Sequence, residues 1–428
     1  MAGALLIVFV VGLIVGMPVA LTMGLAGTVA VLVGGQFPPI VTVQYMFNGI
    51  NSFPLMAVPF FILAAELMTA SGLTGALLRF ANDLVGHIRG GLGHVNVLVS
   101  VMVAGISGSA LADAAGPGAL IMRMMRRAGY HAEYAGALSA ATATIGPIIP
   151  PSILMVIYAI TDSRVTVAGL FLAGVVPGLM LGLALAAANH WISIRRDYRF
   201  RSERATLARL ARSFWSAVPA LLMPAIILGG ILGGVFTPTE AAAAAVAYAI
   251  LIGFATGGLK PGDLPRVFVR SGVITAAVLL IVAMASLFAW LLTVLQIPQT
   301  LAAAIGGLTD SALLILVLLA LFTLLCGLVI DTLPALIILV PVLAPIAYRV
   351  GIDPLHFAMM LVLNLTIGMV TPPVGPVLFV ISAVGRLRME ALVRAILPLL
   401  LAELAVLALV ILFPALSTTV PRLFGYTH

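Results

Sequence analysis

The feature of this sequence that most constrains its fold is a series of long apolar stretches without charge. Residues 1–65 contain no acidic or basic side chain, and apolar stretches recur to the C-terminal end of the chain. A helix needs about 20 apolar residues to cross a membrane. Only 8% of the residues are charged, whereas a soluble protein has about 25%. We therefore predict an all-α integral membrane protein. The unbroken apolar runs exclude a β-barrel, whose strands alternate polar and apolar residues.

Two of the apolar segments contain a break, which predicts elements that do not cross the membrane. The break in the segment 95–122 lies at 105–109, and the break in the segment 311–348 lies near 327–334. Non-helical backbone at membrane depth must be buried in protein or line a cavity. We therefore predict two re-entrant helical hairpins, at about 95–128 and at 311–348. The apolar segments lie near 5–33, 53–70, 95–122, 134–160, 167–190, 216–234, 240–257, 273–294, 311–348, 355–382 and 391–414.

The distribution of basic residues predicts the topology. If both hairpins enter and leave on one face, the other nine segments cross the membrane. Cytoplasmic loops then hold 18 lysine and arginine residues and outer loops hold 3, as the positive-inside rule requires. This predicts a multi-pass protein of a bacterial or archaeal inner membrane, with a cytoplasmic N-terminus and a periplasmic C-terminus. We expect the first apolar segment to be a retained helix rather than a signal peptide, because no small-residue cleavage site follows it.

An internal repeat divides the chain into two halves. Residues 144–151, TIGPIIPP, match residues 366–373, TIGMVTPP, at five of eight positions. Each Pro-Pro pair predicts a broken helix, at about 134–160 and about 355–382, because proline removes a backbone donor. The predicted topology gives the two halves opposite orientation. Inverted repeats with paired broken helices are typical of secondary transporters, whose site lies at the membrane midplane between the halves.

The repeat predicts three parts of the chain. These are a first inverted repeat at 1–190, a cytoplasmic basic loop with a linking helix at 191–235, and a second inverted repeat at 236–428. We interpret the arginine-rich loop as a topology determinant that contacts anionic membrane lipid, and we expect no nucleic acid as a partner.

Polar and glycine residues at the four breaks form the candidate site. A break exposes helix N–H groups, which favour anions, and leaves carbonyl and hydroxyl oxygens, which suit a hard cation such as Na⁺. The alternative is that glycine and serine only allow close helix packing. We expect Na⁺ to be the coupling ion, and we expect no other cofactor and no transition-metal site. The candidate substrate- and Na⁺-binding residues are Ser107, Gly108, Ser109, Asp113, Thr144, Gly146, Pro150, Gly327, Asp331, Thr332, Asn364, Thr366, Gly368, Thr371, Pro372 and Gly375.

Other motifs leave alternatives open. Glu66 and Glu403 fall in apolar segments, where an acid is either functional or reaches the interface from a helix end. Thr237 and Glu240 have the spacing of a helix capping box. Residues 105–108, GISG, fit the GxSG of rhomboid-type intramembrane proteases, but the histidines are badly placed to act as a base. We therefore expect no enzyme activity. Since no Walker A motif occurs, energy must come from an ion gradient or from another subunit.

The sequence resembles the large membrane subunit of the tripartite ATP-independent periplasmic (TRAP) transporters over essentially its whole length. The resemblance rests on residues 104–159, on 234–241 (GVFTPTEA), on 351–357 (GIDPLHF) and on 364–375 (NLTIGMVTPPVG). It implies Na⁺-coupled import of an organic acid, such as a C4-dicarboxylate, sialic acid or another sugar acid. It also implies two partners, a small four-helix membrane subunit and a periplasmic solute-binding protein.

The resemblance further implies an elevator-type transporter, in which the hairpins and broken helices move against a scaffold. We expect the small subunit to be a separate chain, because no extra helical block precedes the match. One alternative is a stand-alone Na⁺/dicarboxylate carrier that needs no binding protein. Another is a channel-like or structural membrane component. The residues that would line the Na⁺ and substrate sites by resemblance are Ser107, Ser109, Asn364, Thr366, Thr371 and Gly375.

Overall fold

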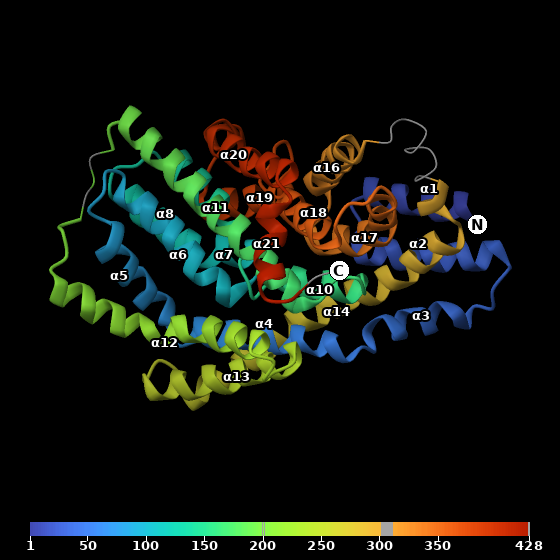
Figure 1. The fold of residues 1–428 in the computed structure, drawn as a ribbon, viewed down its shortest axis with the longest axis horizontal. Helices are drawn as coiled ribbons and strands as arrows, with labels where there is room; N and C mark the ends of the chain where they lie inside the picture. The colour runs from blue at the N-terminus through green and yellow to red at the C-terminus, as the bar shows by residue number, and fades with distance from the viewer. Residues whose placement is uncertain (199, 201, 301–310, 427–428) are drawn as a thin grey trace.

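The computed structural model describes residues 1–198, 200, 202–300 and 311–426, and every regular element in them is a helix (Figure 1). Short 3₁₀ or π turns are labelled η. The elements are α1 (Ala2–Ile14), α2 (Val19–Gly34), α3 (Ile40–Ile50), η1 (Phe53–Met56), α4 (Ala57–Ala70), α5 (Leu73–Val85), α6 (Gly91–Ser107), α7 (Ala110–Asp113), η2 (Ala114–Gly118), α8 (Ala119–Arg127), α9 (Ala132–Ala143), α10 (Ile153–Thr161), α11 (Val167–Arg195), α12 (Leu207–Leu232), α13 (Pro238–Ala255), η3 (Pro261–Asp263), α14 (Leu264–Val294), α16 (Ala312–Val329), α17 (Thr332–Arg349), α18 (Pro354–Gly368), α19 (Pro376–Gly385), α20 (Met389–Leu412) and α21 (Ala415–Leu423).

The predicted all-α membrane fold is confirmed by the length and composition of these helices. Within the described residues, seven segments are long and apolar enough to cross a membrane. Several shorter apolar helices accompany them, including both helices of the first apolar segment. The seven segments are Phe53–Ala70, Val167–Arg195, Leu207–Leu232, Pro238–Ala255, Pro261–Val294, Thr332–Arg349 and Met389–Leu412.

Both hairpins form where the apolar segments are interrupted. In the first, Gly108 ends α6 with a positive φ of 58° and Ser109 caps α7, so the chain reverses and α8 packs back against α6. In the second, α16 ends at an extended Ile330, Asp331 caps α17, and α17 returns along α16. A left-handed glycine and two short capping side chains are therefore enough to stop and restart a helix at these points.

Both broken helices also form as predicted. The first runs as α9 and α10 with non-helical backbone between Ala143 and Ile153, and the second as α18 and α19 with a gap between Gly368 and Pro376. Each gap contains the Pro-Pro pair, and both Pro-Pro peptide bonds are cis. The missing proline donors explain why the helix cannot continue through either segment.

The first apolar segment differs from the prediction, because the chain folds it as two helices rather than one. The helices α1 and α2 are separated by Gly16, which has a φ of +80°, and by Pro18. They pack closely: a Cβ at Gly12 would lie 2.6 Å from the Thr22 side chain. The prediction that the segment 5–33 forms a single spanning helix was therefore wrong, because apolar residues on both sides of the turn hide it in the hydropathy pattern.

The helices pack in two groups. The peripheral group consists of α1–α5 and α12–α14: α4 packs against α13, α12 against α5, and α14 against α2, α3 and α4. The central group consists of α6–α11 and α16–α21: α9 packs against α20, α16 against α18, and α11 against α20 and α21. In Figure 1, α4, α12 and α13 of the peripheral group run along the lower edge, below the central group. The hairpins and the broken helices all belong to the central group.

The polar connection between the groups is shorter than the predicted loop, because α11 continues to Arg195 and α12 begins at Leu207. Tyr198 within this connection lies 2.8 Å from His131 Nδ1, measured at its hydroxyl oxygen, in the central group. Ser202 donates its backbone N–H to Gly86 O at 2.9 Å, at the end of α5. The connection is thus bonded to the central group through Tyr198 and to the peripheral group through Ser202.

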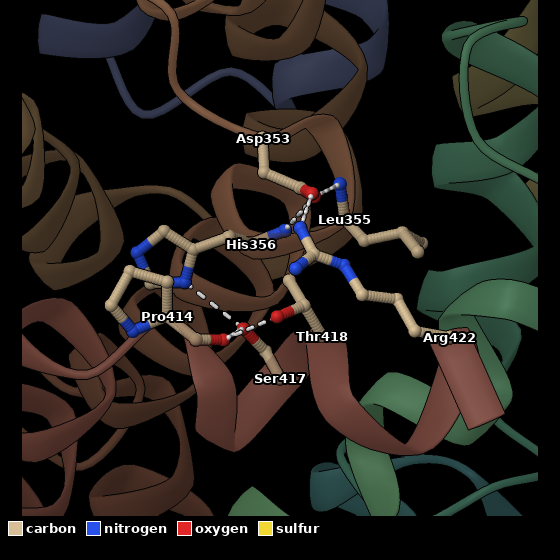
Figure 2. Close-up of polar contacts among 7 residues, drawn as sticks. All are labelled: Asp353, Leu355, His356, Pro414, Ser417, Thr418 and Arg422. Atoms are coloured by element: carbon tan, nitrogen blue, oxygen red, sulfur yellow. Dashed lines mark hydrogen bonds and ion pairs between the residues drawn. The ribbon is translucent and has the colours of Figure 1, made fainter. Parts of the chain in front are cut away.

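A short C-terminal helix, α21, packs against the N-terminal end of α18 (Figure 2). The imidazole Nδ1 of the buried His356 lies 2.9 Å from Ser417 Oγ, and Arg422 forms an ion pair with Asp353 at 3.0 Å. Asp353 also caps α18 by accepting from the N–H groups of Leu355 and His356. These contacts fix the start of α18, which places its other end at the second break.

Candidate functional site

The tips of the two hairpins meet at one cavity of about 160 Å³. Gly108 and Ser109 line it from the first tip, and Asp331 and Thr332 line it from the second. Pro147 and Met369 add one residue from each broken-helix gap. The structure therefore brings together four breaks that lie far apart in the sequence, which is the arrangement that the repeat predicted.

One wall of the cavity is apolar and comes from the peripheral group. Ile62 of α4 and Ile274, Val278 and Ile281 of α14 line this side. The cavity thus lies on the boundary between the two helix groups. Among the described residues that line it, Asp331 carries the only formal charge and none is basic.

The first tip depends on the absence of a side chain at Gly108. A Cβ there would lie 3.2 Å from both Ile153 N and Pro151 O, so the tip rests directly on the backbone of the first broken helix. Ser109 Oγ accepts from Ala112 N at 3.4 Å and begins α7. Ser107 is the last residue of α6, but its side chain lies outside what the structure describes.

The second tip presents Asp331 and Thr332 to the cavity. Asp331 Oδ1 accepts the backbone N–H of Thr332 at 2.9 Å, and Thr332 is buried. Behind the tip, Gly327 of α16 and Gly368 of α18 touch backbone to backbone, since a Cβ on Gly368 would lie 2.8 Å from Gly327 Cα. Two predicted site residues therefore act here as a close helix contact, the alternative that the sequence left open.

Behind the first tip, Asp113 and the residues of the first gap form a buried polar cluster. Asp113 is buried, and a Cβ on Gly146 would lie 2.2 Å from its Oδ2, so its carboxylate lies directly on the gap backbone. Thr144 is 2.6 Å from Ala141 O and 2.9 Å from Glu403 Oε1 of α20. Pro150 lies within the gap in a cis bond to Pro151.

Behind the second tip, Asn364 is the most constrained predicted residue. Its Nδ2 donates to Ala320 O and, at 2.6 Å, to Thr323 Oγ1, both on α16. Because Thr323 Oγ1 itself donates to Leu319 O, it must accept from Asn364, which fixes the amide orientation. Asn364 Oδ1 is then a buried acceptor without a hydrogen-bond partner among the described residues.

The other predicted residues in or beside the second gap form local contacts. Thr366 donates to Val362 O at 2.7 Å and Thr371 donates to Ile367 O at 2.8 Å. Gly375 has a φ of +43° and leaves no room for a side chain beside Met369 O, at 3.0 Å. Pro372 precedes Pro373 in the cis bond. Each of these hydroxyls keeps oxygen lone pairs that a cation can use.

The structure therefore separates the predicted residues into three places. The cavity takes Gly108, Ser109, Asp331 and Thr332, and a polar cluster lies behind each tip. Sequence reasoning missed Thr323, the Asn364 partner, and the apolar wall from α4 and α14. Thr323 could have been found from its position, one helical turn before Gly327. Nothing in the sequence distinguishes the wall residues from other apolar positions.

The structure gives polar partners to Glu66 and Glu403, the two acids whose roles the sequence did not decide. Glu66 Oε2 pairs with Arg270 Nε at 3.1 Å and joins α4 to α14. Glu403 is fully buried and contacts Thr144 across 259 residues of sequence. The Thr237–Glu240 capping box is confirmed, with both reciprocal bonds present at the start of α13.

Comparison with known proteins adds independent observations. Residues 6–416 match the family described as the tripartite ATP-independent periplasmic transporter, DctM component. The chain is 41% identical over 416 residues to the sialic acid TRAP transporter large permease protein SiaM of Vibrio cholerae, with 97% of each chain covered. It is 38% identical over 406 residues to the 2,3-diketo-L-gulonate TRAP transporter large permease protein YiaN of Escherichia coli, with 95% of each covered.

A solved structure shares the fold. The YdaH transporter of Alcanivorax borkumensis, whose crystal structure is described as having an unusual topology, superposes with a TM-score of 0.67 over 86% of each chain. The sequences are 17% identical, so this likeness concerns the fold alone.

Proposed function

This chain belongs to the DctM family of tripartite ATP-independent periplasmic transporters, and we propose that it couples the import of an organic acid to Na⁺. The observation that carries the proposal is the cavity where both hairpin tips meet. Helices α7 and α17 begin at Ser109 and Asp331, both of which line the cavity, and the N-terminal end of a helix favours an anionic group. The two relatives described above are named for sialic acid and 2,3-diketo-L-gulonate, which are both carboxylic acids.

Cation coupling follows from the charge of the site. Of the described lining residues none is basic and one, Asp331, is acidic, so a carboxylate that enters alone would meet no compensating charge from them. Na⁺ would supply that charge. We assign the second polar cluster as one ion site, because Asn364 Oδ1 is a buried acceptor with no partner in the part of the chain that the structure describes, and because amide and hydroxyl oxygens suit a hard cation. The corresponding candidate for an ion site in the first half is the cluster of Asp113, Thr144 and Gly146.

The proposed movement is an elevator step of the central group against the peripheral group. The wall from Ile62, Ile274, Val278 and Ile281 supports this, because an apolar surface offers no directional bonds that would resist sliding. The cavity of about 160 Å³ is smaller than usual ligand pockets of 300–1,000 Å³. A sugar acid would therefore need the tips to move apart from this wall before it binds.

The proposed partners are a small membrane subunit of four helices and a periplasmic solute-binding protein, as the description of the family as tripartite suggests. The alternative is a stand-alone carrier of the same architecture. Proteoliposomes that contain this chain and the small subunit distinguish the two: uptake of a carboxylate should require both a Na⁺ gradient and the added binding protein. Uptake without the binding protein would favour the stand-alone carrier, and uptake without Na⁺ would remove the coupling proposal.

The same preparation tests the charge that moves. A dianion carried with two Na⁺ transfers no net charge, whereas a third Na⁺ adds one charge. One charge gains about 2.3 kcal/mol per 100 mV, which is close to fiftyfold in accumulation. We expect an inside-negative potential set with K⁺ and valinomycin to raise uptake of a dicarboxylate accordingly. Uptake that is the same at zero and at negative potential contradicts this stoichiometry.

The split of the first apolar segment changes the proposed position of the N-terminus. Because α1 and α2 form a helical hairpin, residue 1 returns to the face from which α3 starts. Helix α3 has 11 residues, about 16 Å, and is too short to cross. With the basic loops cytoplasmic, α4 starts outside, so both termini lie on the periplasmic face.

Cysteine labelling checks this topology. In a Cys326→Ala background, Ala2→Cys should react with a membrane-impermeant maleimide in intact spheroplasts. Glu203→Cys, in the basic connection, should react only after permeabilisation. The reverse pattern at residue 2 restores the cytoplasmic N-terminus that a single first span predicted.

A further inference from the structure

A second cavity, of about 410 Å³, lies away from the hairpin tips between α5, α8 and α12. Arg79 and Asp83 line it from α5, Arg209 and Arg212 from α12, and Met124 from α8. Helices α5 and α12 belong to the peripheral group and α8 to the central group. The cavity therefore lies at the boundary between the two groups, at the end of the chain's basic connection.

The charges of this cavity are unbalanced. Asp83 is largely buried, and its Oδ1 pairs with Arg209 Nε at 2.9 Å. Within the described part of the chain, Arg79 and Arg212 have no acidic side chain at ion-pair distance. Three guanidinium groups thus face one carboxylate. The start of α12, capped by Thr206, adds the positive end of a helix dipole.

Helix α12, which supplies two of these arginines, also exposes apolar and aromatic side chains on its other faces. Leu207 is 86% exposed and Trp215 is 70% exposed, although both flank the arginines on α12. Phe214 is also exposed and packs edge-on against Phe80 of α5, with ring centroids 5.5 Å apart. Tryptophan and phenylalanine beside arginine are typical of the layer where lipid headgroups meet hydrocarbon. An aqueous loop would not leave these side chains exposed.

We propose that this cavity binds the phosphate headgroup of an anionic membrane phospholipid. Arg79 and Arg212 hold the phosphate oxygens, since guanidinium groups match oxyanions with paired donors. The first part of the acyl chains lies along the apolar lining residues Leu78 and Met124. An acidic segment of the small subunit is the competing occupant, but three arginines beside the apolar Leu78 and Met124, two of them on a helix that exposes tryptophan and phenylalanine, fit a phospholipid better. The proposal rests on the cytoplasmic position of the basic loops in the proposed function.

Because Met124 is part of the central group, the bound lipid would contact both groups at once. Movement of α8 past α5 and α12 would then open one side of the headgroup site. The movement of the central group would therefore depend on the lipid that is bound.

Lipid binding to the purified full-length chain in detergent tests the proposal without any transport measurement. Native mass spectrometry would follow titration with phosphatidylglycerol, with phosphatidylcholine and with inorganic phosphate. We expect the unaltered chain to prefer phosphatidylglycerol. The double variant Arg79→Gln, Arg212→Gln should bind it about 25-fold more weakly, since each basic residue near an anionic surface contributes roughly fivefold. The matched control is Arg266→Gln, Arg388→Gln, which removes two exposed arginines elsewhere and should leave the affinity unchanged.

Several results would overturn the lipid assignment. Equal affinity for phosphatidylcholine removes the need for a negative headgroup. Competition by inorganic phosphate at equal concentration indicates a site for a soluble anion. Loss of bound phosphatidylglycerol when the small subunit is added indicates that the cavity is a subunit contact. No result of the lipid titration tests the import proposal, which depends on the uptake assay. The lipid proposal and the import proposal can therefore fail independently.

Discussion

Replacing Asn364 by leucine is expected to lower Na⁺-dependent uptake by roughly 10- to 150-fold, because a contact to a charged group contributes roughly 1.5–3 kcal/mol. The side chain is fully buried, and its amide orientation is fixed by Ala320 O and Thr323 Oγ1. Only Oδ1 then remains to face an ion. Leucine keeps the approximate volume of the residue and removes that oxygen. The measurement is initial uptake into proteoliposomes as a function of Na⁺.

A binding measurement separates loss of the ion site from loss of fold. An ion that binds only the folded state stabilises it by about 2.7 kcal/mol at 100 times its Kd. The unaltered chain should therefore melt at a higher temperature in NaCl than in KCl, whereas Asn364→Leu should melt equally in both. Thr323→Val is the matched control: it removes one bond to Nδ2 but keeps Oδ1, so the Na⁺ effect should persist. A Na⁺-dependent melting temperature in Asn364→Leu would exclude this residue as an ion ligand.

Replacing Gly368 by alanine is expected to reduce uptake more than tenfold, because it separates the second hairpin from the second broken helix. The new Cβ would lie 2.8 Å from Gly327 Cα and 2.9 Å from Gly327 C. Both are backbone atoms and cannot rotate away, so α16 must shift against α18. Overpacking of this kind costs about 1–3 kcal/mol. The shift would also carry Asn364 away from Thr323 and Ala320.

The control for this prediction is Gly229→Ala in α12. A Cβ at Gly229 meets no atom within 4 Å, so the substitution only removes backbone freedom and should leave uptake and melting temperature unchanged or slightly raised. Gly327→Ala should cause a smaller loss than Gly368→Ala, since its Cβ would lie 3.2 Å from Gly368 Cα. Full activity in Gly368→Ala would show that the two helices need not touch during transport.

The two hairpins and the two broken helices were predictable from sequence because their causes are local. Glycine, serine, aspartate and Pro-Pro interrupt runs that are otherwise apolar, and the backbone needs those residue types where a helix stops. The turn at Gly16 and Pro18 carried a similar local cause. It was missed because hydropathy stays high through the turn, so the apolar segment reads as continuous.

The candidate site was predictable only in part. The tips met as expected at Gly108, Ser109, Asp331 and Thr332. Gly327 and Gly368, by contrast, serve a backbone contact that no spacing rule gives, because the two residues are on different helices. The same holds for Thr144 with Glu403, which are 259 residues apart, and for Asn364 with Thr323, which are 41 apart.

The sequence by itself determined that this chain is a membrane protein of helices with four interruptions, because burial in lipid and the stopping of a helix depend on residue type and near neighbours. Only the tertiary structure decided which interruptions share the cavity, that the amide oxygen of Asn364 has no partner among the described residues, and which helices supply the apolar wall. Those outcomes depend on packing between distant segments, where one apolar or small residue resembles another in sequence but only one position lies at the contact.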